Sequence, residues 1–277
     1  MLYDTRYLWL SVALFFASIF PLFLSSQATS QRADILIIAP HPDDAVLCCA
    51  GFIQQAITKG QSIHILELTH GEAYTDAAAY LSKKPATSLT TDDYLRLGNA
   101  RKKEEYRATH ILGLSRHNIT FLGYPDGLLE EVYNTHDGSP FSSRYTGLSA
   151  SPETGMPYAN AAMTNDIATT ITRTKPTLIV VPDTGDTALD HIIARKFVDD
   201  AMEHIAYQGQ LLTYVIHNDA APLFANDTPL MRIHLNKLEK RKKLKAITTY
   251  RTQHAIEPEY VFSFANNEEI FAQFTQP

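Results

Sequence analysis

Apolar runs typical of strands alternate with amphipathic runs typical of helices along most of the chain. Strands are predicted at residues 34–39, 62–69, 118–122, 176–182, 211–216 and 260–264. Helices are predicted at residues 45–58, 93–114, 159–172, 192–205 and 236–250. Because strands that alternate with helices build parallel sheets with right-handed crossovers, we expect an α/β fold with a mainly parallel sheet and helices on both faces.

Polar side chains follow the predicted strands at their carboxyl ends. His41, Asp43 and Asp44 come directly after the first strand, Asp126 follows the third and His191 follows the fourth. The carboxyl ends of parallel strands meet at one edge of a sheet, where ligands of such folds bind. We therefore expect these side chains to share one site.

The side chains at these strand ends have the chemistry of a metal hydrolase. Zinc accepts imidazole and carboxylate ligands, which makes His41, Asp44 and His191 the predicted ligands, and Fe²⁺ accepts the same types. Asp43 is the predicted general base, because it stands beside the ligands and can take a proton from a metal-activated water. The alternative for Asp43 and Asp44 is to cap the helix that follows. A dinucleotide fingerprint, a P-loop and a nucleophile elbow are all missing from the sequence.

Two charged side chains fall on the apolar face of the helix predicted at residues 93–114. They are Arg101 and Glu104, and charges on such a face are normally paired or functional. Either they pair with each other or they serve the site. The long connections at residues 73–92 and 130–158 are expected to cover the site or line a substrate groove.

The N-terminal segment predicts export. Residues 7–24 contain no charge, Arg6 precedes them, and small residues including Ser26 and Ala28 follow. This order is typical of a secretory signal, here residues 1–28, and the apolar run is also about long enough to remain as a membrane anchor. A single domain, residues 33–277, follows, so the protein is expected to be periplasmic, extracellular or membrane-anchored.

Composition excludes one class of partner and leaves others open. The net charge of −6 argues against a nucleic-acid partner, and no protein partner is evident. The basic run Lys240-Arg241-Lys242-Lys243 is interpreted as a solvated helix face. Cys48 and Cys49 are interpreted as small buried apolar residues, because adjacent cysteines rarely satisfy disulfide geometry.

Several segments together resemble the PIG-L/LmbE-like zinc-dependent de-N-acetylases. The matching segments, in chain order, are His41-Pro42-Asp43-Asp44, Gly71-Glu72-Ala73, Arg101 with Glu104, Phe121 to Gly127, and Asp190-His191. The resemblance implies a Rossmann-like fold and hydrolysis of an acetyl group from an N-acetylated sugar or glycoconjugate. It implies zinc at His41, Asp44 and His191, acid–base catalysis by Asp43, and substrate contacts by Arg101 and Asp126.

Two positions depart from the family pattern. Ala45 stands where Glu is usual, and Ala188 replaces the first His of the usual His-Pro-Asp-His. In the family that His stabilises the oxyanion, a role worth about 2.7–4 kcal/mol by analogy with oxyanion-hole donors. His217, Arg101 or the metal would have to compensate, so His217 joins the predicted substrate-binding residues.

Three functions therefore stay open on the sequence alone. The first is an exported zinc-dependent deacetylase. The second is a carbohydrate-binding or scaffolding relative that keeps the fold but not the reaction, which Ala45 and Ala188 would favour. The third is a related metal hydrolase that acts on another amide or an ester.

Overall fold

The computed structural model describes residues 32–135, 141–218, 224 and 227–274. Residues Gln31–Pro277 form a compact unit by themselves, and both main hydrophobic clusters lie inside it. The predicted leader, residues 1–28, lies outside the described residues. No helix in the described part of the chain is long and apolar enough to span a bilayer.

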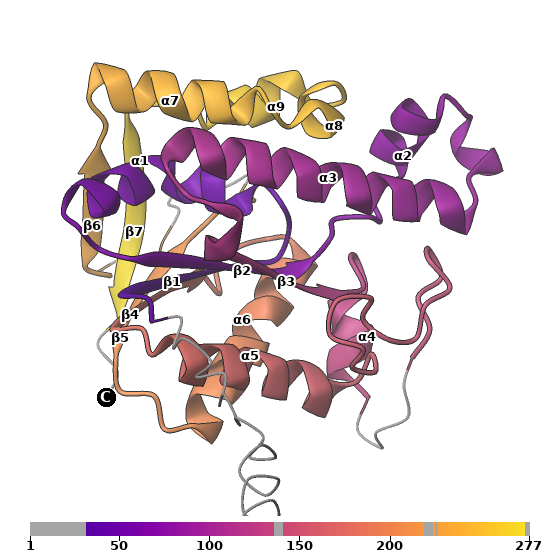
Figure 1. Cartoon of the computed structure of the whole chain (residues 1–277), viewed down its shortest axis with the longest axis horizontal. Coiled ribbons are helices and arrows are strands. Elements are labelled where there is room, and N and C mark those ends of the chain that lie inside the picture. The colour runs from indigo at the N-terminus through magenta and orange to yellow at the C-terminus, as the bar shows by residue number, and fades with distance from the viewer. Residues whose placement is uncertain (1–31, 136–140, 219–223, 225–226, 275–277) are drawn as a thin grey trace, which may run out of the picture. The chain divides into compact units, whose positions relative to one another are not determined.

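A seven-stranded sheet forms the centre of this unit (Figure 1). Its strand order is β3-β2-β1-β4-β5-β7-β6. The first five strands pair in parallel, whereas β7 is antiparallel to both β5 and β6. The expected Rossmann-like, mainly parallel α/β fold is thus confirmed. The strands are β1 (Ile35–Ala39), β2 (Ile63–Thr69), β3 (Ile119–Tyr124), β4 (Leu178–Pro182), β5 (Gln210–Tyr214), β6 (Leu230–His234) and β7 (Glu268–Phe274).

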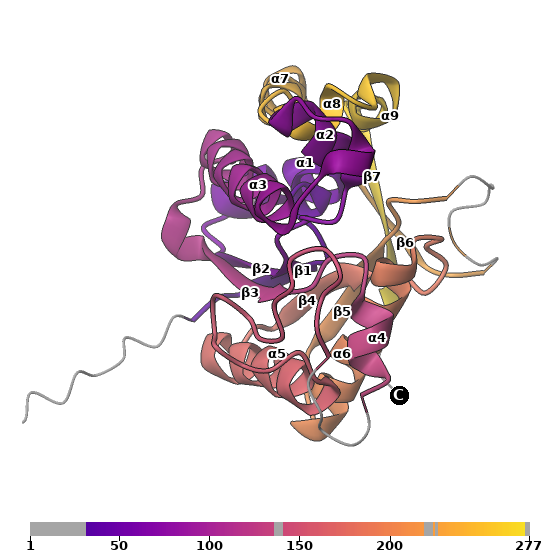
Figure 2. The same ribbon diagram turned by 90° about the vertical axis from the view of Figure 1, so that its right-hand side faces the viewer.

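Helices cover both faces of the sheet (Figures 1 and 2). One face carries α1 (Asp44–Thr58), α3 (Thr91–Leu112) and α7 (Lys237–Ile247), and the other carries α5 (Asn160–Thr174) and α6 (Leu189–His204). The two layers follow from the alternation of side chains along each buried strand. In β1, for example, Ile35 and Ile37 pack in the cluster with α1, while Leu36 and Ile38 pack in the cluster with α5 and α6.

The C-terminal part of the chain differs from the prediction. Residues 260–264 were predicted to form a strand, but most of them belong to helix α9 (Pro258–Ser263), which follows α8 (Arg251–His254). Pro258 favours this helix because its missing N–H is harmless in a first turn. The antiparallel strands β6 and β7 were not predicted. No residue of β6 is buried, and β7 begins with two adjacent glutamates, so neither strand shows a clear apolar pattern.

The connection at residues 73–92 is also more ordered than predicted. It contains α2 (Thr75–Ser82) and the 3₁₀ turn η2 (Ala86–Ser88). The buried residues of α2 are two alanines, which give a weak periodic signal. Two further short elements are the 3₁₀ turn η3 (Arg116–Asn118) and helix α4 (Leu129–Tyr133).

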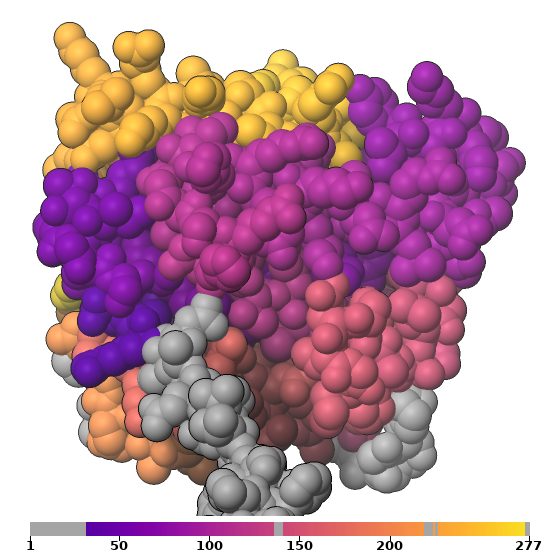
Figure 3. Space-filling view, in the orientation of Figure 1, coloured from indigo at the N-terminus to yellow at the C-terminus, as the bar shows by residue number. Residues whose placement is uncertain are grey.

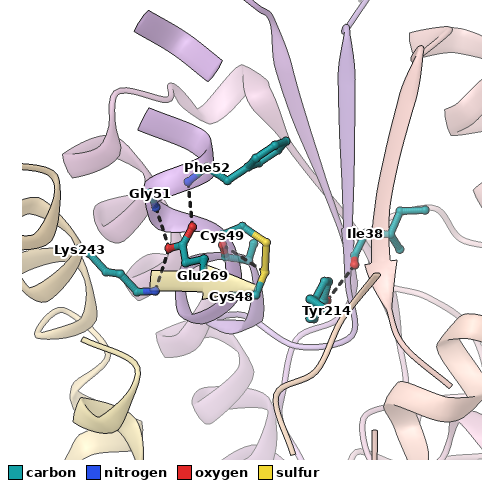
Figure 4. Close-up of a disulfide and its surroundings, with 9 residues drawn as sticks. Ile38, Cys48, Cys49, Gly51, Phe52, Tyr214, Lys243 and Glu269 are labelled. Atoms are coloured by element: carbon teal, nitrogen blue, oxygen red, sulfur yellow. Dashed lines mark hydrogen bonds and ion pairs between the residues drawn. A yellow bond between two sulfur atoms is a disulfide. The ribbon is translucent and has the colours of Figure 1, made fainter. Parts of the chain in front are cut away.

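Lys243 is not on a solvated face, so that part of the prediction is wrong. Its side chain is 1% exposed, and its Nζ lies 2.8 Å from Oε1 of Glu269 in β7. The same carboxylate accepts hydrogen bonds of 2.8 Å from the backbone N–H groups of Gly51 and Phe52 in α1 (Figure 4). Glu269 thus ties β7 to α1 and α7, and the buried charges compensate each other.

Cys48 and Cys49 are buried as predicted but form a disulfide with each other, which corrects the prediction that they are unpaired. Figure 4 shows this disulfide in α1, one turn before the amides that bind Glu269. Adjacent cysteines close such a ring only if the local backbone adapts. The backbone N–H groups of Gly51 and Phe52, which follow the disulfide, donate to the carboxylate of Glu269, which lies outside the helix. The local sequence does not reveal this tertiary contact.

Candidate functional site

The predicted site residues meet at the carboxyl edge of the sheet. β1 leads into His41, Asp43 and Asp44, β3 leads into Asp126, and the first turn of α6 contributes His191. A cavity of about 340 Å³ opens over these strand ends. Arg101 and His217 also line it, and the ring of His191 lies next to that of His217, with 4.9 Å between the ring centroids. The predicted metal-binding, catalytic and substrate-binding residues therefore lie together.

His41, Asp44 and His191 converge on one point, as predicted for metal ligands. Their candidate ligand atoms all lie within 4.8 Å of one another. Oδ2 of Asp44 lies 3.3 Å from Nδ1 of His41 and 3.2 Å from Nε2 of His191. The geometry brings two imidazoles and one carboxylate together, the set that a zinc site with an open position requires.

The burial and the pKa shifts of these ligand groups indicate that the cluster suits a cation. Both nitrogens of His191 are buried, and a carboxylate oxygen lies 3.2 Å from each of them without a well-formed hydrogen bond. Burial lowers the pKa of His191, but the Asp44 and Asp186 carboxylates outweigh it and raise the pKa to about 9. Burial opposes ionisation of Asp44 as well, yet the two imidazoles hold its pKa well below the usual value. The cluster therefore stabilises positive charge in a buried position, so the residues fit a divalent metal.

Asp186 contacts the second ring nitrogen of His191 and was not identified as a site residue from the sequence. Its Oδ2 lies 3.2 Å from Nδ1 of His191. The carboxylate is itself fixed by the backbone N–H groups of Ala188, Ile216 and His217 at 2.8 to 3.1 Å. A carboxylate on the second nitrogen of a ligating imidazole fixes its orientation and increases its basicity.

Asp126 and Asp190 contact the other side of His41. Nε2 of His41 lies 3.0 Å from Oδ1 of Asp126 and 3.5 Å from Oδ2 of Asp190. Asp190 also accepts hydrogen bonds from the backbone N–H groups of Gly127 and Leu129, which fixes the turn that carries Asp126. These contacts of Asp190 are tertiary and could not be predicted from the sequence. The sequence showed only that Asp190 precedes His191.

Asp43 lines the cavity beside the ligands. It has φ 130°, an unusual value for a residue other than glycine, and such strain is typical of functional positions. Asp43 occupies the N-cap position of α1, but its side chain makes no capping hydrogen bond. The Asp44 carboxylate accepts from the N–H of His41, so neither carboxylate caps the helix. Burial raises the pKa of Asp43 to about 7, although the Arg101 guanidinium opposes the rise.

Arg101 holds this corner of the site in place. Its guanidinium donates to the carbonyl oxygens of Gly71 and Pro42 at 2.9 Å and to Oδ1 of Asp43 at 3.1 Å. Gly71 has φ +64°, and a Cβ at this position would come within 2.2 Å of Arg101, so only glycine fits there. Glu104 instead accepts from Thr252 at 2.6 Å, so Arg101 and Glu104 have different hydrogen-bond partners.

His217 and Tyr260 form the cavity wall next to His191. The ring centroids of His217 and His191 are 4.9 Å apart. The ring of Tyr260 stacks on His217, and its hydroxyl lies 2.8 Å from Nδ1 of His217. The backbone carbonyl of His217 accepts from the N–H of Thr187, which places His217 beside the loop that contains Ala188. Tyr260 was not predicted as a site residue, because its segment was expected to be a strand.

The cavity lining also includes aromatic and polar side chains. They are Tyr74, Tyr145, Gln253 and Glu257. Tyr74 and Tyr145 come from the two long connections that were expected to cover the site. Tyrosine rings of this kind suit the apolar faces of sugar rings.

Comparison with known proteins identifies the family. The chain matches the model of the PIG-L family, described as GlcNAc-PI de-N-acetylase, over residues 36–202, which is more than half of the chain. The protein therefore belongs to the PIG-L family. No curated protein matches the chain.

Solved structures share the fold at low sequence identity. The N,N'-diacetylchitobiose deacetylase from Pyrococcus horikoshii is 18% identical, with a TM-score of 0.56 over 88% of this chain and 84% of that one. The A40926 pseudoaglycone deacetylase is 19% identical, with a TM-score of 0.58 over 87% and 97%. The 4-carboxy-2-hydroxymuconate hydratase from Pseudomonas putida is 18% identical, with a TM-score of 0.60 over 88% and 97%. Two of these three are deacetylases and one is a hydratase, so the fold alone does not determine the reaction.

Proposed function

We propose that the protein is a metal-dependent hydrolase that removes the acetyl group from an N-acetylated sugar or glycoconjugate. The observation that carries this proposal is the convergence of His41, Asp44 and His191 beside the strained Asp43. Family membership supports it, since the family is described by de-N-acetylation of GlcNAc-PI. The metal is Zn²⁺ or another divalent ion such as Fe²⁺, because both accept these ligands.

The residues around the metal position have separate roles in amide hydrolysis. A divalent cation held there supplies Lewis acidity toward the acetamide and acidifies a water molecule. Asp43 takes the proton from the attacking water and returns it to the amine nitrogen as that nitrogen leaves. Arg101 keeps the Asp43 carboxylate aimed at the cavity through the 3.1 Å contact.

His217 takes the place of the family histidine that Ala188 replaces. It lines the cavity on the side of Ala188, and Tyr260 and Thr187 hold its ring and backbone in place. An imidazole N–H in this position donates to the carbonyl oxygen of the acetamide as negative charge develops on it. Asp126 contacts His41 and borders the same cavity, where it can accept a hydrogen bond from a sugar hydroxyl.

The charges of the cavity favour a substrate without phosphate groups. Asp43, Asp44, Asp126 and Glu257 line it, and Arg101 is the one Lys or Arg among the described lining residues. Its guanidinium already binds Asp43 and two carbonyl oxygens. Phosphate recognition normally uses free Arg or Lys side chains. A neutral glycan that ends in N-acetylglucosamine therefore fits better than a sugar phosphate.

The experiment that tests this function is acetate release by the metal-loaded protein. The substrates are N,N'-diacetylchitobiose and N-acetylglucosamine 1-phosphate, and the control is the His191→Ala variant. The proposal predicts acetate release, faster from the neutral substrate, that disappears in the variant. Equal acetate release by the variant would contradict the role of the cluster.

The second candidate function is a glycan-binding relative without catalysis, which Ala188 favours. Ala188 stands at the N-cap of α6, and its side chain offers no hydrogen-bond donor. In that case the protein would bind metal and the neutral glycan but release no acetate. Calorimetric titration of the same two sugars separates this function from the enzymatic one.

We also propose that the protein is exported. The charge-free run at residues 7–24 supports this, and so does the Cys48–Cys49 disulfide, because disulfides persist mainly in oxidising compartments. Fractionation of cells followed by N-terminal sequencing tests the proposal. A cytosolic protein that keeps residues 1–28 would contradict it.

A further inference from the structure

The outward face of α7 carries basic and apolar side chains together. Lys237, Leu238, Arg241, Leu244 and Lys245 are all exposed, and helical periodicity places them opposite the buried positions of the helix. Leu238 and Leu244 are 61% and 42% exposed, which is high for leucine. We call these five residues the α7 face. In Figure 3 the α7 region lies along the upper edge, with long side chains projecting outward.

No carboxylate of α7 neutralises this face. The one acid in the helix, Glu239, turns back toward the protein, where its Oε2 accepts from the N–H of Asn236 and from Nε2 of Gln55. Lys240 and Lys242 add two more cations at the flanks. A helix of 11 residues thus presents excess positive charge on a chain whose net charge is −6.

The neighbouring helix α3 continues the positive charge. α3 packs beside α7, and Arg96, Lys103 and Arg107 lie exposed along a surface groove of about 610 Å³ on α3. Asp92 and the buried Glu104 also line this groove, and α9, which contacts α7 as well, adds the exposed Glu259. Cations therefore outnumber acids on this side of the molecule.

We propose that the α7 face docks the protein onto an anionic phospholipid surface. Lysine and arginine bind lipid phosphates, and leucines exposed among them can enter the boundary between headgroups and acyl chains. Two exposed leucines would add little to binding of a nucleic acid, which depends on phosphate contacts and on base stacking or edge contacts. Two copies of this face would repel each other across a two-fold axis, which disfavours a dimer. The proposal does not depend on the enzymatic function.

Vesicle binding tests the proposal with a matched pair of variants. The protein is the segment 29–277, which contains the whole compact unit and lacks the apolar run 7–24 that could bind lipid itself. The test variant is Lys237→Gln/Arg241→Gln/Lys245→Gln. The control is Lys83→Gln/Lys175→Gln/Lys196→Gln, which removes the same charge from exposed positions on α6 and at the ends of α2 and α5.

Partition is measured by cosedimentation with vesicles of phosphatidylcholine, alone or with about 30% phosphatidylglycerol, at about 0.1 M salt. We expect binding to the anionic vesicles only, a loss of about 100-fold in the test variant, and no loss in the control. Leu238→Ser/Leu244→Ser should reduce binding further at high salt, where leucine insertion dominates. All the changed residues are exposed, so the thermal midpoint should stay constant.

Three results would overturn the proposal. The first is equal partition of the test and control variants. The second is no binding of the unmodified protein to anionic vesicles. The third is binding to a DNA duplex, or self-association in sedimentation, that depends on the α7 face while vesicle binding does not.

Discussion

Oδ2 of Asp186 lies 3.2 Å from Nδ1 of His191, on the side of the imidazole ring opposite Asp44. The two carboxylates therefore hold the ring between them. Because three backbone N–H groups fix Asp186, the orientation of His191 is set by the loop before α6 and by the end of β5. This relationship makes Asp186 a positioning residue for the predicted metal site.

Replacement of Asp186 by Asn should weaken metal binding without removing a ligand. An orienting carboxylate behind a metal-bound histidine typically contributes 10–100-fold in affinity, so we expect a loss of about that size. Competition with a chromophoric chelator measures it. Asp199→Asn, at a half-exposed carboxylate that contacts Arg195 on α6, is the control. Unchanged affinity in Asp186→Asn would show that the orientation of His191 is set by other contacts.

Replacement of His217 should slow the reaction more than it weakens substrate binding. If His217 donates to the developing oxyanion, His217→Ala lowers kcat by about 10²–10³ and changes KM little. Tyr260→Phe removes the hydroxyl that lies 2.8 Å from Nδ1 of His217, and it should lower kcat by a smaller factor. Ala188→His in the His217→Ala background should restore part of the rate. A change confined to KM would assign His217 to substrate binding only.

Removal of the Glu269 carboxylate should strongly destabilise the fold. Glu269→Ala leaves the Lys243 ammonium buried without its partner and leaves the N–H groups of Gly51 and Phe52 without this acceptor. Breaking a buried pair in this way costs about 3–5 kcal/mol. Urea unfolding measures the change, and Lys243→Met/Glu269→Gln, which removes both charges, should recover part of it. A loss below about 1 kcal/mol would indicate that water reaches the pair.

Stability should fall as the pH rises through the neutral range because of a buried carboxyl pair. Burial raises the pKa of Glu105 to about 8, although the hydrogen bond from Tyr250 opposes the rise. Burial and the charge of Glu105 raise the pKa of Glu67 well above its usual value. The unfolded chain releases these protons near pH 4.3, so between about pH 4.3 and 8 the folded state binds more protons and loses stability with rising pH.

The Glu105→Gln variant isolates this effect. It should remove up to about 1.4 kcal/mol per pH unit from the slope of the unfolding free energy over that window. Urea unfolding at several pH values measures the slope, with Glu203→Gln at an exposed position of α6 as the control. The same slope in both variants would mean that Glu105 is ionised in the folded protein at neutral pH.

The sequence predicts the part of the site that depends on strand ends. His41, Asp44, Asp126 and His191 lie together because parallel strands bring their carboxyl ends to one edge, and the order of apolar runs already shows this. Asp186 could not be identified in the same way. Its contact with His191 depends on how the loop before α6 folds against the end of β5.

The C-terminal region was the least predictable part of the fold. β7 contains Glu268 and Glu269, and Glu269 is buried only because Lys243 and two backbone amides meet it there. A pattern of apolar positions cannot show compensation between segments that are far apart in the chain. The Cys48–Cys49 disulfide was missed for a different reason, because adjacent cysteines rarely satisfy disulfide geometry and the prediction followed that rule.

The Asp43→Asn variant tests the central claim most directly, through metal content and acetate release measured on the same sample. We predict about one divalent metal per chain in both the unmodified protein and the variant. We also predict that acetate release from N,N'-diacetylchitobiose falls by about 10²–10⁴ in the variant, because Asn cannot accept the proton of the attacking water. Turnover that persists in Asp43→Asn, or loss of its metal, would contradict the role of Asp43 as the general base beside an independent His41, Asp44 and His191 site.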